Sequence, residues 1–63
     1  MTRIKKWIRV EFIDGTSEQY LSILNYANVT EADESFLLIL REGLKTYIPH
    51  SVIKIIEAGD YED

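Results

Sequence analysis

The first part of the chain alternates between apolar and polar residues. Over residues 4–13, Ile8 and Val10 share one parity, whereas Trp7 and Arg9 share the other. A period of two in a run rich in β-branched and aromatic residues predicts a half-buried β-strand. One face of this strand should therefore pack on a core, and the other should meet solvent.

A hairpin turn should follow at Asp14-Gly15, because both residues tolerate positive φ. Two registers fit the strand that returns from it. A two-residue turn would place Glu11 opposite Glu18, which is unfavourable. A three-residue turn with a bulge at the glycine would instead place Ile8 opposite Tyr20. The pattern leaves both registers open.

Four more strands should follow the first. Residues 16–29 return from the turn, and residues 30–35, TEADES, are the most polar stretch and indicate a loop. Residues 36–40, FLLIL, are apolar on both parities, which predicts a strand covered on both faces, either at the centre of a barrel or in a sheet packed against another chain. Glu42-Gly43 is a second hairpin signal, and the strand that returns from it should end at Ile48.

The segment IPHSVIKI, residues 48–55, should bend the sheet. Pro49 cannot donate to a β-ladder, so the fourth strand stops before it. Ser51 favours a short 3₁₀ turn, after which the fifth strand resumes. His50 is the single histidine, and this segment offers it neither a carboxylate nor a base–nucleophile arrangement, so we interpret it as a turn residue.

Five strands with a 3₁₀ turn before the last resemble the small SH3-like and Sm-like barrels. The resemblance rests on the hairpin at Asp14-Gly15, the central pair that turns at Glu42-Gly43, and IPHSVIKI leading into the last strand. The chain is also similar in style to short proteins of phages and mobile elements of Gram-positive bacteria. The resemblance implies one all-β domain over residues 1–63, closed as a five-stranded barrel, and a role in binding. Residues 58–63 are expected to form a frayed acidic tail.

Charge is unevenly distributed along the 63 residues. The formal net charge is −4, yet four of the seven basic residues fall within the first nine positions. A net acidic domain lacks the general electrostatic footprint of a nucleic-acid binder, so only a local basic patch could serve that function. Acidic residues gather near the middle and the end of the chain: Glu31, Asp33 and Glu34, then Glu57, Asp60, Glu62 and Asp63.

Several chemistries lack their residues in this sequence. It contains no cysteine for a disulfide, a thiol nucleophile or a thiolate zinc site, and its acidic residues do not have the spacing of a calcium loop. It has no apolar run of about 18 residues, and the start MTRIKKWIRV lacks the apolar centre of a signal peptide. We therefore expect a cytoplasmic protein without enzyme activity, cofactor or membrane contact. Because no disulfide or metal supports so small a core, self-association would add stability.

The candidate binding residues belong to the solvent face of the first hairpin. Lys5, Trp7 and Arg9 alternate along the first strand, and Tyr20 is expected near them in either register. Tryptophan and tyrosine beside arginine are typical of interface anchors and, less often, of platforms on which nucleic-acid bases stack. The alternative is that Trp7 closes one end of the core with Arg9 across its ring.

These features predict a protein–protein interaction module, a phage or mobile-element accessory that inhibits or redirects a host protein. Its acidic residues Glu31, Asp33 and Glu34 would meet a basic surface of the partner, and the Trp7 side of the first hairpin would supply the anchor. Two alternatives stay open. One is an Sm-like, oligomeric binder of nucleic acid or nucleotides, and the other is a self-assembling structural protein that pairs through FLLIL or an edge strand.

Overall fold

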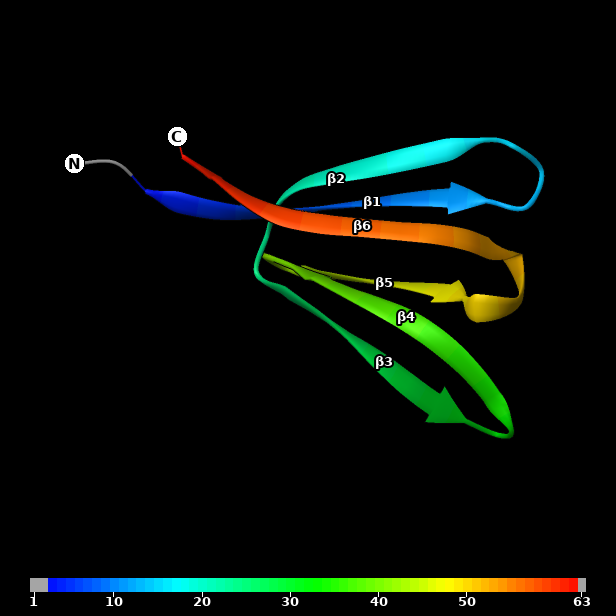
Figure 1. The fold of residues 1–63 in the computed structure, drawn as a ribbon. Helices are drawn as coiled ribbons and strands as arrows, with labels where there is room; N and C mark the ends of the chain where they lie inside the picture. Colours follow the sequence, from blue (N-terminus) through cyan, green and yellow to red (C-terminus); the bar gives the residue numbers. More distant parts are fainter. Residues whose placement is uncertain (1–2, 63) are drawn as a thin grey trace.

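The computed structural model describes residues 3–62, which form six β-strands and one 3₁₀ turn. In chain order these are β1 (Ile4–Phe12), β2 (Ser17–Ile23), β3 (Asn25–Glu31), β4 (Glu34–Arg41), β5 (Leu44–Pro49), η1 (His50–Val52) and β6 (Ile53–Glu62). The strands build two three-stranded antiparallel sheets, ordered β2-β1-β6 and β3-β4-β5 (Figure 1). The all-β prediction is confirmed, and the 3₁₀ turn precedes the last strand as expected.

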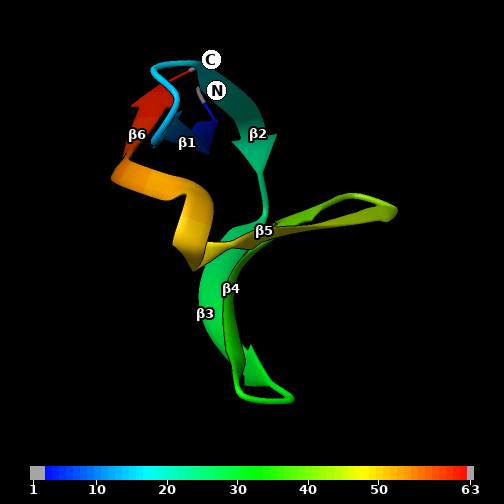
Figure 2. The same ribbon diagram turned by 90° about the vertical axis from the view of Figure 1, so that its right-hand side faces the viewer.

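The two sheets are joined on two sides of the molecule. On one side β2 leads into β3, and on the other η1 carries the chain from β5 to β6 (Figure 2). Away from the β2–β3 link, β3 diverges from the first sheet (Figure 1). Tyr26 on β3 is accordingly 40% exposed, although it lies opposite the buried Ile39. The inner face of β3 is therefore only partly covered.

The predicted second strand is in fact two strands. β2 ends at Ile23 and β3 begins at Asn25, with Leu24 between them. Ser22 has a φ of 58°, and the register of β1 and β2 shifts beside it, which indicates a β-bulge. The Leu24 N–H then donates to the Leu40 carbonyl at 2.8 Å. The chain changes sheets at this bulge, so the expectation of five strands is wrong by one.

The first hairpin adopts the three-residue register. Ile8 lies opposite Tyr20. The Phe12 N–H donates to the Thr16 carbonyl at 2.8 Å, and the Gly15 N–H donates to the Phe12 carbonyl at 3.0 Å. Gly15 has a φ of 91°, a conformation that disfavours any side chain. Gly15 supplies the one positive φ that a three-residue turn with a bulge needs, whereas Asp14 does not adopt the positive φ that a two-residue type I′ turn would also need.

Residues 30–35 are not the loop that their polarity predicts. β3 continues to Glu31 and β4 begins at Glu34, so only Ala32 and Asp33 form the turn. Both turn residues have positive φ, 50° and 66°, as in a type I′ turn, whose twist matches that of the paired strands. The sequence hides this turn because Ala-Asp is not one of the dipeptides that usually adopt it.

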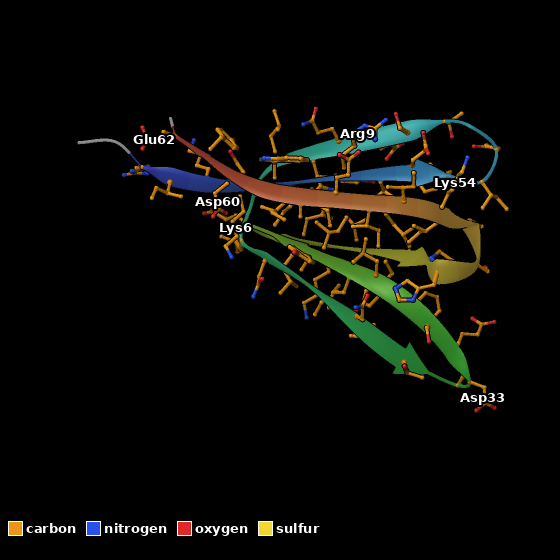
Figure 3. All side chains as sticks on the ribbon, viewed as in Figure 1. Lys6, Arg9, Asp33, Lys54, Asp60 and Glu62 are labelled. Carbon is orange, nitrogen blue, oxygen red and sulfur yellow. The ribbon has the colours of Figure 1, made fainter. Side chains whose placement is uncertain are left out.

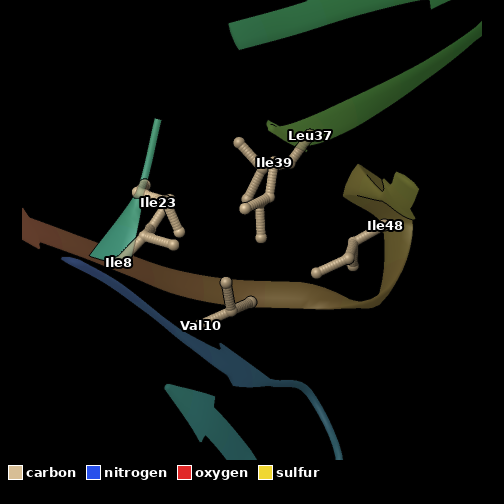
Figure 4. Packing of buried hydrophobic residues seen from close by; sticks show 6 residues of the cluster. All are labelled: Ile8, Val10, Ile23, Leu37, Ile39 and Ile48. Atoms are coloured by element: carbon tan, nitrogen blue, oxygen red, sulfur yellow. The ribbon is translucent and has the colours of Figure 1, made fainter. Parts of the chain in front are cut away.

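A small core fills the space between the sheets. On β4, Leu37 and Ile39 are buried in it, whereas Phe36, Leu38 and Leu40 are only half-buried. No further layer of residues 3–62 packs outside the second sheet, so the chain itself covers only one face of FLLIL. Coverage of both faces within the chain is therefore wrong, whereas packing against another chain stays a prediction. The buried hydrophobic residues are Ile8, Val10, Ile23, Leu37, Ile39 and Ile48 (Figure 4).

Residues 58–62 form a paired strand rather than a frayed tail. β6 runs to Glu62 and pairs with β1 along its length. Lys6 lies opposite Asp60 (Figure 3), so the basic start of the chain pairs with its acidic end. Opposite charges on facing strands favour such pairing, which is why this segment is ordered. Asp63, the last residue of the predicted tail, lies outside the described residues.

Candidate functional site

The candidate site is the outer face of the first sheet, the side that points away from the core. Ile8 and Val10 point inward from β1, so the residues that alternate with them along the strand point outward. Trp7 lies on this outer side, opposite Leu21 on β2 and Gly59 on β6. The part of this outer side around the indole is here called the Trp7 face. Besides Trp7, Leu21 and Gly59 it contains Lys5, Arg9, Gln19, Glu57 and Tyr61.

The Trp7 indole lies on the backbone of β6. A Cβ atom built on Gly59 would lie 3.0 Å from Trp7 Nε1 and 3.1 Å from Cε2 and Cζ2. The indole therefore occupies the space that a side chain at residue 59 would take. It is half-buried by this contact and does not belong to the core cluster. Trp7 was expected either on the solvent face of the first hairpin or at one end of the core, and the structure shows it on the solvent face.

A charged pair and an exposed leucine lie beside the indole. Arg9 donates from Nη1 to Glu57 Oε1 at 2.9 Å, across β1 and β6. Both side chains are solvent-accessible, so the pair adds little stability, but it fixes the arginine next to the ring. Leu21, on the other side of Trp7, is 57% exposed. An aromatic ring with an aliphatic neighbour and an oriented arginine is the composition of an interface anchor.

Tyr61 closes one end of the same face. It lies on β6 opposite Lys5, and its hydroxyl is 2.9 Å from Ser22 Oγ on β2. The tyrosine side chain therefore spans β1 and joins the two outer strands at the bulge. Sequence reasoning missed Gly59 and Tyr61 because it predicts a tail over residues 58–63, and it missed Glu57 because it does not pair the last strand with the first. The readable signal is charge: Lys6 and Arg9 near the start lie opposite the acidic residues Asp60 and Glu57 near the end.

Tyr20 does not belong to the Trp7 face. It lies opposite Ile8, so it points inward and packs against the core. The Arg41 guanidinium lies 5.0 Å from the centre of its ring. Its hydroxyl donates to Glu18 Oε2 at 2.5 Å. Burial, together with the neighbouring Glu18 carboxylate, raises the pKa of Tyr20 to about 12. The expected grouping of Tyr20 with Trp7 and Arg9 is wrong because the three-residue turn reverses its side.

The acidic residues lie on the other sheet. Glu31 and Glu34 end β3 and β4 opposite each other, and Asp33 is in the turn between them. Figure 3 shows Asp33 at the tip of this hairpin, far from Arg9. Asp33 and Glu34 line a shallow open hollow together with His50. The structure therefore separates the acidic residues from the Trp7 face instead of combining them in one surface.

His50 is anchored beside that hollow. Its Nε2 lies 2.9 Å from Asn28 Oδ1 on β3, so the ring links η1 to the partly covered inner face of that strand. Within residues 3–62, no three carboxylate or imidazole side chains are placed so as to hold a metal ion together. The same range includes no helix with the length and apolar character needed to cross a membrane. The observed contact gives His50 a role in holding β3.

The molecule is thus an all-β protein of two small sheets that presents an aromatic face on the first sheet and an acidic hairpin on the second. Comparison with protein-family models, with curated proteins and with solved structures gives no match for this chain.

Proposed function

We propose that this chain is a non-enzymatic binding module that acts through protein–protein contact at the Trp7 face. The observation that carries the proposal is the position of the indole over Gly59. A half-exposed tryptophan held flat on a sheet loses little conformational freedom on binding and offers a large apolar contact. Its neighbours Leu21 and Arg9 extend the contact with aliphatic and charged surface.

In this proposal the scaffold is an SH3-like barrel. Three features support that architecture: the strand orders β2-β1-β6 and β3-β4-β5, the near-continuous path from β2 into β3, and the 3₁₀ turn before β6. Such a scaffold leaves the outer faces of both sheets free for binding, because its interior is filled by side chains.

The partner we propose is a host protein with a basic surface, and the chain is a phage or mobile-element accessory that inhibits or redirects it in the cytoplasm. The net charge of −4 and the acidic hairpin formed by Glu31, Asp33 and Glu34 support a basic partner, because complementary charge accelerates association and selects against wrong partners. The Trp7 face would supply affinity, and the hairpin would supply orientation.

A nucleic-acid or nucleotide binder remains the second candidate, since an exposed indole is also a stacking platform. The Arg9–Glu57 pair weakens it, because a carboxylate beside the ring repels phosphate. Titration with oligonucleotides at low salt, followed by Trp7 fluorescence, discriminates the two. Quenching of the Trp7 emission that salt reverses would favour nucleic-acid binding, and an unchanged emission would exclude it.

Affinity capture from a Gram-positive bacterial lysate tests the main proposal. The wild-type chain should retain a stoichiometric protein partner, and Trp7→Ala should lose it. Tyr47→Ala is the matched control, because Tyr47 is an exposed aromatic residue on the second sheet, and this variant should keep the partner. Equal retention by Trp7→Ala and the wild type would refute the assignment of the site.

A further inference from the structure

The outer face of the second sheet is apolar across all three strands. Phe36, Leu38 and Leu40 point outward from β4, because Leu37 and Ile39 between them point into the core. Cross-strand partners lie on the same side of a sheet, so this face also includes Ala27, Val29, Tyr47 and Pro49. We call these seven residues the Leu38 face.

The Leu38 face is contiguous and exposed. Tyr47 is 53% exposed, and its ring meets that of Phe36 edge-on, with centroids 6.3 Å apart. At the open end of the sheet the apolar surface continues to Leu24, which is 62% exposed and lines a shallow hollow with Leu40. Contiguous apolar surface of this kind on a small protein marks an interaction site.

Charges of opposite sign lie at the two ends of this face. Lys45 lies opposite Leu40, so it points outward at one end. Glu31 and Glu34 lie opposite each other and point outward at the other end. Two carboxylates directly across a strand pair repel each other. A cation brought to that end of the sheet would relieve the repulsion.

We infer that two copies of this chain pair through their Leu38 faces, with the strands of one copy antiparallel to those of the other. A two-fold axis that crosses the strands near Leu38 places the Lys45 end of each copy over the Glu34 end of the other. A two-fold axis along the strands would instead bring like charges together. The face is therefore complementary to itself in one orientation, which is the requirement of a symmetric dimer interface.

The area of the Leu38 face determines how tightly the two copies should bind each other. Three strands about 4.8 Å apart, over about seven residues at about 3.4 Å each, cover roughly 14 × 24 Å. This is smaller than a standard interface of about 800 Å² per partner, so the dimer should be weak and should dissociate in the micromolar range or above. In such a dimer both Trp7 faces stay free, whereas the second copy and a basic partner would compete for Glu31 and Glu34.

Mass measured by light scattering and sedimentation between about 1 μM and about 1 mM tests this inference directly. The wild type should change from monomer to dimer over that range. Leu38→Lys puts an unpaired charge at the centre of the face and should remain monomeric throughout. Leu21→Lys makes the same change at an exposed leucine on the first sheet, and it should dimerise like the wild type.

A charge exchange tests the orientation independently, also if Leu38→Lys does not fold. Lys45→Glu and Glu34→Lys should each dimerise less tightly than the wild type, because each homodimer would bring like charges together. An equimolar mixture of the two variants should form a heterodimer, in which both contacts are again between opposite charges. A wild type that stays monomeric, a Leu38→Lys variant that still dimerises, or a mixture that associates no better than its components would overturn the inference. None of these results depends on the partner proposed for the Trp7 face.

Discussion

The indole of Trp7 occupies the space above Gly59, so these two residues of β1 and β6 act as one unit. The backbone of residue 59 is extended, and only the ring excludes a side chain there. Alanine at this position would meet the indole at 3.0–3.1 Å, closer than an unstrained contact. The preference for glycine at this position therefore comes from the ring and not from the backbone.

A double-mutant cycle on this pair tests that relationship. Gly59→Ala should destabilise the wild type and shift the tryptophan emission, because the indole must move. In a Trp7→Ala background the same change should stabilise the protein by about 0.5–1 kcal/mol, since glycine inside a strand is unfavourable compared with alanine. Chemical denaturation of the four proteins gives the coupling. An effect of equal sign in both backgrounds would show that the ring does not rest on residue 59.

Tyr20 should make stability fall in strong alkali. Its pKa is raised to about 12 in the folded state, against about 10 for an unperturbed tyrosine. Between these values the unfolded chain has lost a proton that the folded chain keeps, so the free energy of unfolding falls as pH rises from about 10 to about 12. Denaturant midpoints for the wild type and Tyr20→Phe should converge over this interval. Parallel curves would contradict the shift.

Asp14 should stabilise the first hairpin at neutral pH and lose that effect in acid. Thr16 donates to Asp14 Oδ1 from its hydroxyl at 2.6 Å and from its backbone N–H at 3.0 Å, and these bonds lower the pKa of the carboxyl below 3.8. A lowered folded-state pKa gives a contribution that is present above the unfolded value and disappears as pH falls through the folded one. Asp14→Ala should therefore melt at a lower temperature than the wild type at pH 7. The two melting temperatures should approach each other below pH 3.8, and a constant difference would argue against the role of charge.

Two neighbours on β4 should respond differently to truncation, because they lie on opposite faces of the strand. Ile39 is fully buried, so Ile39→Ala should cost about 2–5 kcal/mol, enough to unfold much of so small a protein. Leu38→Ala, measured on dilute monomer, should cost about 1 kcal/mol or less, because that side chain is already half in solvent. Urea titrations decide the matter, and comparable losses at both positions would mean that the second sheet is covered on both sides.

Local pattern predicts the strands of this protein better than their long-range pairing. The alternation around Ile8 and Val10 correctly places β1 and its buried face. The 3₁₀ turn directly follows Pro49 as expected, although β5 includes the proline and does not end at Ile48. The same reasoning fails at Ser22, because no sequence pattern indicates that a serine will adopt a positive φ. The bulge at this residue divides one predicted strand into two.

The candidate site shows the same limit. Trp7 and Arg9 stand out from their strand alone, but their contacts Gly59 and Glu57 are almost a full chain length away. Tyr20 was assigned to the wrong side because that assignment depends on the length of the turn at Gly15. A difference of one residue in a turn moves every following side chain to the opposite face.

The pairing of β1 with β6 also determines the order in which the molecule can be completed. The meander of β3, β4 and β5 has only short connections, so it can form while the rest of the chain is still being synthesised. The first sheet cannot be completed before β6 is made, and the pairing that supports Trp7 joins residues 52 positions apart in the sequence. During synthesis on the ribosome, the recognition surface should therefore form after the second sheet, and a nascent chain that stops short of Gly59 should display a tryptophan with no strand beneath it.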